Sequence, residues 1–218
     1  AGVVANMPVG SVEVYDGLIS NLYLNQIDDD KIKVIVDNEH PSEFEYEVTG
    51  ELPVRFIINM ERSFIFKLFH DKKIVIDPGH GGKDPGATAI DKKTYEKDLN
   101  LDVAHRLDRI LKDIGFRTIM TRSDDSYMDL VSRSGLANNS YADFFMSIHF
   151  NAFMSSAKGI ETLYYPNDIT DEYPYDNRVM ANLFHNEIMD ALKRSSRGIT
   201  PRPGLHVLNK TKMPAILA

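Results

Sequence analysis

The sequence predicts an α/β fold with a mostly parallel sheet and helices on both faces, preceded by a small antiparallel β domain. Two observations carry this prediction. Residues 72–218 alternate short apolar strands with helical patterns, which is typical of a parallel sheet covered by helices. Residues 1–71 instead contain short segments in which apolar and polar positions alternate with a period of two. We therefore expect two domains, residues 1–71 and 72–218, with the boundary at residues 70–72.

The first domain is predicted to consist of strands joined by turns. Period-two alternation predicts strands at residues 32–36, 44–48 and 54–58, and turn-forming residues lie at 28–30 and 49–50. No segment shows a helical period, so we expect no helix here. A domain of this size folds alone only marginally.

The second domain begins with a strand at residues 73–76, followed by a long amphipathic helix. Apolar residues of this helix recur at steps of four, four, three and four, from Leu99 to Ile114, and Gly115 occupies a C-cap position. The remaining pattern predicts strands at 116–120, 143–148, 160–165, 206–208 and 215–217, and helices at 129–137 and 180–192.

Composition excludes several classes of function. The net charge is −7, from 25 Lys and Arg against 32 Asp and Glu, and no dense basic run suggests nucleic acid as a partner. There is no cysteine, so any metal must be held by His, Asp or Glu. No apolar run approaches the roughly 18 residues of a membrane span. The first ten residues lack the charged and apolar regions of a signal peptide.

Three residues at predicted strand and helix ends suggest a metal site. His80 follows the strand at 73–76, His149 ends the strand at 143–148, and Glu96 opens the long helix. Sites in open α/β sheets form beyond the carboxyl ends of the strands. Two imidazoles and one carboxylate suit zinc, with a fourth position left for water. The glycine-rich string around His80 is also compatible with a turn that carries an incidental histidine.

Short strings distributed over residues 73–218 resemble the zinc-dependent N-acetylmuramoyl-L-alanine amidases of bacterial cell walls. These strings are IDPGHGG at 76–82, DPGA at 84–87, EKDLNL at 96–101, TR at 121–122, SIHFNA at 147–152, GIET at 159–162, LHVL at 205–208 and MPAIL at 213–217. The resemblance implies that His80, Glu96 and His149 bind Zn²⁺. It also implies that zinc-activated water cleaves the amide between N-acetylmuramic acid and L-alanine in peptidoglycan.

The resemblance also implies where the protein acts. Residues 1–71 resemble, more weakly, the AMIN domain that precedes many such amidases and localises them at the cell envelope, although this copy is expected to be truncated at its front. The alternative is an unrelated β module that only packs against the catalytic domain. We therefore expect a secreted or cell-wall-associated autolysin, periplasmic if the source has an outer membrane.

The sequence departs from the family pattern at the general acid/base. The family places this glutamate directly after the strand that begins Met-Pro-Ala, so we expect it just after Ala218, with the C-terminal end of the domain missing here. Glu161 is an alternative candidate, although pairing with a neighbour is its simpler interpretation. If the base is absent, the alternative function is a catalytically silent peptidoglycan-binding protein. Another zinc peptidase acting on wall peptides is chemically equivalent at the metal.

Several further residues are candidates for supporting roles. Asn151 and His206 are expected to contact substrate. Asp84 is a candidate metal ligand or an acceptor that hydrogen-bonds a ligating histidine. Asp77 is a candidate for holding a ligating histidine in its tautomer, although turn-stabilising roles suit both. Arg122 and Arg133 are interpreted as structural ion-pair residues, with binding of stem-peptide carboxylates as the alternative.

Overall fold

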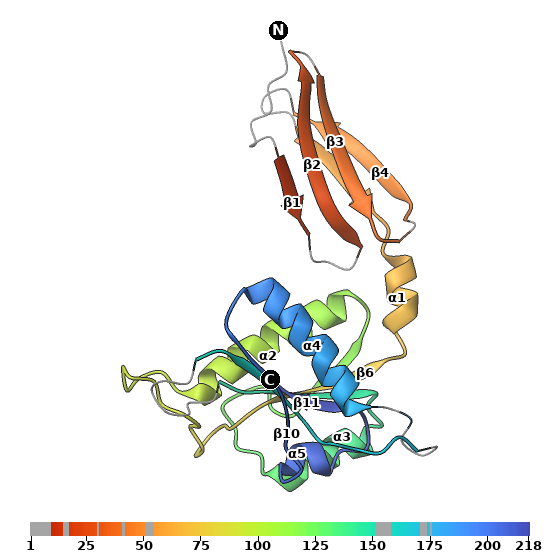
Figure 1. Cartoon of the computed structure of the whole chain (residues 1–218). Helices are drawn as coiled ribbons and strands as arrows, with labels where there is room; N and C mark the ends of the chain where they lie inside the picture. Colours follow the sequence, from red (N-terminus) through yellow and green to blue (C-terminus); the bar gives the residue numbers. More distant parts are fainter. Residues whose placement is uncertain are drawn as a thin grey trace. The chain divides into compact units, whose positions relative to one another are not determined.

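The chain forms two compact units, Ala1–Asp71 and Lys72–Ala218, in a computed structural model (Figure 1). The structure describes residues 10–14, 18–29, 31–40, 42–50, 55–150, 158–170, 174 and 176–218. Within these ranges, no helix is both long and apolar enough to cross a membrane.

The first unit consists of two antiparallel sheets and one short helix. Strands β1 (Gly10–Glu13), β2 (Ile19–Asp28) and β3 (Lys31–Asn38) form one sheet, β4 (Phe44–Thr49) and β5 (Arg55–Met60) form a hairpin, and helix α1 spans Ser63–Phe69. The three predicted strands are confirmed as β3, β4 and β5, and neither β1 nor β2 was predicted. The expectation of no helix was wrong, because the seven residues of α1 make only two turns, too few for a period to appear.

The second unit contains a six-stranded sheet in the order β10-β9-β11-β8-β6-β7. Every neighbouring pair is parallel except β9 with β11, which confirms the mostly parallel sheet. The strands are β6 (Lys73–Pro78), β7 (Arg117–Met120), β8 (Phe144–Ile148), β9 (Ile160–Tyr164), β10 (Ser196–Pro201) and β11 (Ala215–Leu217). Only β10 was not predicted.

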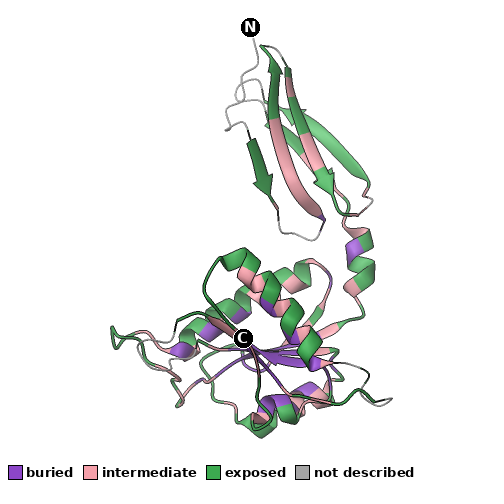
Figure 2. Cartoon of the chain, viewed as in Figure 1, coloured by how far each residue is buried: buried purple, intermediate pink, exposed green. Residues whose placement is uncertain are grey.

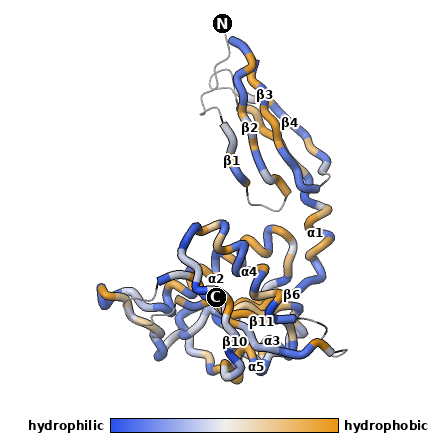
Figure 3. Tube along the Cα trace, viewed as in Figure 1, coloured by the Kyte–Doolittle hydropathy of each residue, from blue (hydrophilic) through white to orange (hydrophobic). Residues whose placement is uncertain are grey.

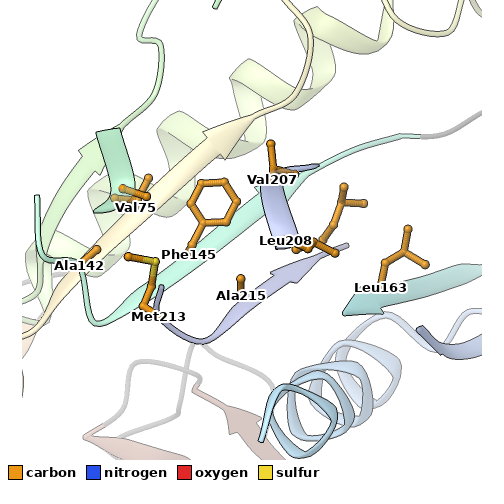
Figure 4. Packing of buried hydrophobic residues seen from close by; sticks show 10 residues of the cluster. Val75, Ala142, Phe145, Leu163, Val207, Leu208, Met213 and Ala215 are labelled. Atoms are coloured by element: carbon orange, nitrogen blue, oxygen red, sulfur yellow. The ribbon is translucent and has the colours of Figure 1, made fainter. Parts of the chain in front are cut away.

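Helices cover both faces of this sheet, as predicted. One face packs on α2 (Glu96–Asp113) and α4 (Asn177–Leu192), through Ala104 and Ala181. The other packs on α3 (Leu130–Asn139) and α5 (His206–Asn209), and Figure 4 shows Phe145 with Val75 on one side and Val207 and Leu208 of α5 on the other. The predicted strand at 206–208 was therefore wrong. A short apolar run suits a buried helical turn as well as a strand.

The central strands are buried on both sides, as expected for a covered parallel sheet. In β6, every residue from Ile74 to Pro78 is buried (Figure 2). Figure 3 shows hydrophobic colour in the middle of the sheet near β6 and β11, in keeping with the apolar residues 74–76 of β6. Strands β6 and β8 are parallel neighbours with Pro78 opposite Ile148, so the residues that follow both strands emerge at one edge of the sheet.

Candidate metal centre

Three side chains from three elements meet at this edge. His80 lies in the loop after β6, His149 follows β8 directly, and Glu96 is the first residue of α2. Each offers one ligand atom, and these atoms all lie within 4.8 Å of one another. The structure therefore brings together all three residues that were predicted as ligands.

Hydrogen bonds orient the two imidazole rings. His80 Nδ1 lies 2.9 Å from Asp84 Oδ2, which leaves its Nε2 facing Glu96 Oε2 at 3.4 Å. His149 Nδ1 lies 2.9 Å from Glu96 Oε1. The atoms that converge are thus His80 Nε2, His149 Nδ1 and the two oxygens of Glu96. Asp84 is the neighbour that orients His80, as outer-shell carboxylates do at metal sites.

Glu96 is a buried carboxylate that stays ionised. Burial raises its pKa, but hydrogen bonds from His149, His80 and the Ala87 N–H outweigh burial and hold the pKa of Glu96 well below its usual range. Its oxygens also accept hydrogen bonds from the backbone N–H groups of Ala87 and Phe150, at 2.9 and 3.0 Å. Its position in the first turn of α2 favours the negative charge further.

Two glycines allow the backbone to approach the cluster closely. A Cβ at Gly79 would lie 2.2 Å from His149 Nε2. Gly86 has a φ of +66°, and a Cβ there would lie 2.6 Å from His80 Cδ2 and 2.9 Å from Glu96 Oε2. Any side chain at either position would push a ligand out of place, which explains why glycine flanks the cluster.

The cluster opens into a pocket of about 340 Å³. His80, His149 and Asp84 line one part of it, and a mainly apolar wall lines another part, formed by Tyr127, Met128, Leu130 and Val207. The ammonium group of Lys83 lies 4.5 Å from the centroid of the Tyr127 ring. A substrate in this pocket would contact His80, His149 and this wall together.

The other predicted site residues do not join the cluster in the described part of the chain. Glu161 accepts a hydrogen bond from Thr200 Oγ1 at 2.7 Å and pairs with Arg197 at 3.2 Å, and it is not among the pocket-lining residues. His206 begins α5 and contacts Ser134 Oγ at 3.3 Å, while its neighbour Val207 lines the pocket. Asn151 lies outside the described residues.

The two predicted structural arginines are both buried beneath the cluster. The ion pair predicted for Arg122 is not found among the described residues; Arg122 instead donates to the carbonyl oxygens of Pro78 and Gly79, each at 3.0 Å. Arg133 pairs with Asp77 at 2.6 Å. Asp77 therefore contacts an arginine and holds neither histidine in its tautomer. Sequence reasoning missed this pairing, because its partners are 56 positions apart.

Residues 74–218 match a known protein family. A family model described as N-acetylmuramoyl-L-alanine amidase matches these residues. The region is 38% identical over 147 residues to the sporulation-specific N-acetylmuramoyl-L-alanine amidase of Bacillus subtilis, covering 66% of this chain and 54% of that relative. The chain therefore spans about half the length of that relative.

Solved structures show the same likeness. The N-acetylmuramoyl-L-alanine amidase from Clostridium difficile 630 superposes with a TM-score of 0.62 at 39% identity, covering 68% of this chain and 78% of that one. The catalytic domain of CwlV from Bacillus (Paenibacillus) polymyxa var. colistinus gives a TM-score of 0.60 at 38% identity, with coverage of 67% and 78%. The α/β unit and its ligand cluster thus lie within the matched region.

Proposed function

Because the chain belongs to the N-acetylmuramoyl-L-alanine amidase family, we propose that residues 72–218 hydrolyse the amide between N-acetylmuramic acid and L-alanine in peptidoglycan. The observation that carries this proposal is the convergence of His80, Glu96 and His149 at the open edge of the sheet. The pocket beside them has space for a substrate and an apolar wall for the methyl groups that flank this amide.

The donor set fits a zinc ion. Two imidazole nitrogens and one carboxylate are a common catalytic zinc set, and Cys ligands are absent from the sequence. The ionised Glu96 supplies one negative charge, and Asp84 leaves Nε2 of His80 available to the metal. When bound, zinc lowers the pKa of a coordinated water and polarises a carbonyl group.

The residues of this chain perform the remaining tasks. The backbone N–H groups of Ala87 and Phe150 donate to the Glu96 carboxylate, so they would hold it in place as an ionised ligand beside the two histidines. The wall formed by Tyr127, Met128, Leu130 and Val207 orients the substrate and excludes water from one side. Asp77 and Asp84, the carboxylates that line the pocket, are held by Arg133 and His80.

We propose that the proton is transferred by a glutamate placed directly after Ala218. The backbone N–H of His149 donates to the Ala218 carbonyl at 2.8 Å, so a residue joined to Ala218 begins beside the cluster. The test compares chains extended by a short segment that carries either glutamate or glutamine at this position. We expect glutamate to raise turnover by about 10²–10⁴-fold over glutamine. Equal turnover would contradict this assignment.

The activity is tested by digesting purified peptidoglycan with the zinc-loaded, glutamate-extended chain and identifying the soluble products by mass spectrometry. We expect intact stem peptides with a free L-alanine amino terminus, and their loss on chelation or in the His149→Ala variant. Peptides cut at internal bonds would instead indicate another zinc peptidase. Sedimentation with the wall and no release of peptide would indicate a silent binding protein.

The first unit is proposed as an AMIN-like module that binds the cell envelope outside the cytoplasm. Support comes from an apolar face of the β4–β5 hairpin, where Phe44, Tyr46 and Val48 share one side of the strand and are 64%, 65% and 58% exposed. Exposed apolar faces of this kind mark interaction sites. We expect Tyr46→Ser in the full chain to weaken sedimentation with cell walls while zinc affinity stays unchanged. A matched control on the opposite face of the strand is Glu47→Ser.

A further inference from the structure

His80 occupies a backbone conformation that needs external support. Its φ is +62°, in the left-handed region that side chains with a Cβ seldom adopt, and Gly81 and Gly82 continue with positive φ. Such conformations persist only where the surroundings hold them in place. The hydrogen bond with Asp84 holds the imidazole ring of His80. The strained backbone of His80 must therefore be held by a separate contact.

Arg133 supplies that contact from helix α3. Its Nη2 donates to the His80 carbonyl oxygen at 2.7 Å, and its Nη1 donates to the Pro78 carbonyl oxygen at 2.9 Å. Arg133 is 3% exposed, so water does not compete for these hydrogen bonds. A planar guanidinium reaches several acceptors at once in a fixed geometry, which an ammonium group cannot do.

The same guanidinium reaches the pocket wall. Its Nε donates to the Met128 carbonyl oxygen at 2.9 Å, and Met128 lines the pocket. One rigid side chain therefore connects the loop that carries His80 to the segment that faces the substrate.

Asp77 connects this guanidinium to strand β8, which precedes the other histidine. It is 1% exposed and accepts hydrogen bonds from Arg133 Nη1 at 2.6 Å and from Ser147 Oγ at 2.7 Å. Ser147 lies in β8, two residues before His149. The buried pair of Asp77 and Arg133 thus contacts both segments that present histidines.

We propose that Arg133 is a positioning residue that sets the metal affinity of the site by holding the strained backbone of His80, with Asp77 as its anchor. This inference rests on the proposed metal site. It assigns to α3, which contributes none of the three ligands, control over the geometry of the ligand set.

The first test measures zinc affinity of the full chain by competition with a coloured chelator. Arg133→Lys keeps the positive charge but loses the planar set of N–H donors. We expect it to weaken zinc binding by about 10–100-fold, the usual effect of losing a residue that supports a metal ligand. The visible spectrum of the cobalt(II)-loaded variant should also shift, because the ligand geometry changes. Circular dichroism of the metal-free variant checks that it folds.

Arg122→Lys is the matched control. Arg122 is also 3% exposed and also donates to the Pro78 carbonyl, but within the described part of the chain its other hydrogen bonds go to the carbonyl oxygens of Gly79, Lys97 and Asp124 rather than to His80 or Asp77. We expect this variant to lose stability but to change zinc affinity by less than about tenfold. Equal losses of affinity in both variants would show that Arg133 acts only through general stability, and would overturn the proposal.

A second variant covers the case in which Arg133→Lys does not fold. Asp77→Asn keeps the shape of the anchor and removes the charge that faces Arg133, so we expect weaker zinc binding with the arginine still present. Wild-type affinity in Asp77→Asn or in folded Arg133→Lys would refute the positioning role. A wild-type chain that binds no zinc would instead refute the proposed function itself, so the two failures are distinguishable.

Discussion

At the scale of single residues, the two histidines and Glu96 carry the metal site. They converge with one ligand atom each, and no other histidine is among the described residues that line the pocket. We expect His80→Ala or His149→Ala to abolish stoichiometric zinc binding at neutral pH, because two ligands of this type hold catalytic zinc poorly. Metal analysis after dialysis measures this, with His105→Ala as a control in a histidine that hydrogen-bonds the Ser123 carbonyl and does not belong to the ligand cluster. Full zinc content in either ligand variant would refute the assignment.

Asp84 acts on the site through His80. Its Oδ2 fixes Nδ1 of the ring, and its Oδ1 accepts from the Gly86 N–H at 3.2 Å. We expect Asp84→Asn to weaken zinc affinity by about 10–100-fold, because the amide no longer fixes the tautomer by charge. Titration with a chelator measures the change. Asp91→Asn is the control, since Asp91 also caps a turn by accepting from backbone N–H groups but contacts no proposed ligand.

At the scale of elements, helix α2 links the metal site to β7, the outermost strand at one side of the sheet. Its first residue is the ligand Glu96, and further along the helix Asp108 accepts hydrogen bonds from Thr118 on β7 and from Lys112. The side chain of Asp108 is only 16% exposed. Burial raises the pKa of Asp108, but the bonds from Lys112 and Thr118 outweigh it and leave the pKa below its ordinary 3.8.

This shift predicts a pH dependence for the contact between α2 and β7. A carboxyl with a lowered folded-state pKa adds stability above its unfolded pKa, and this stability disappears as the pH falls through the folded-state value. We therefore expect Asp108→Asn to lower the free energy of unfolding by roughly 1–3 kcal/mol at pH 7. The difference from wild type should shrink as the pH falls below about 3.8. Urea denaturation at pH 7 and at a pH below about 3.8 checks this. A difference in the free energy of unfolding that is the same at both pH values would contradict the ionic origin of the contact.

At the scale of the whole molecule, the chain contains two compact units, and the proposed ligands all belong to the second. A metal that binds only the folded state stabilises the unit that holds it, by about 2.7 kcal/mol at a free concentration one hundred times its Kd. We expect calorimetry of the full chain to show two unfolding transitions, and we expect zinc to raise the midpoint temperature of only one of them. The His149→Ala variant should show no shift. A zinc-dependent shift of both transitions would show that the units unfold together.

The sequence by itself determined most of the second unit and its ligand types. Apolar periodicity is a local property, so it located β6, α2, β8 and α4, and strand ends followed by histidines marked the edge where sites form. It failed where local signals are short or ambiguous. Helix α1 has too few turns to show a period, and the buried run at Val207 and Leu208 suits either a strand or a helical turn.

Only the tertiary structure decided how the ligands are held. Asp84 orients the His80 ring, and Arg133 donates a hydrogen bond to the His80 carbonyl oxygen. Arg133 also pairs with Asp77, which lies 56 positions away in the sequence. It also placed Glu161 in an ion pair with Arg197 rather than in the pocket. These contacts depend on the register of neighbouring strands and on which helix covers each face. Both are set by packing between distant segments, so no local pattern of residues contains them.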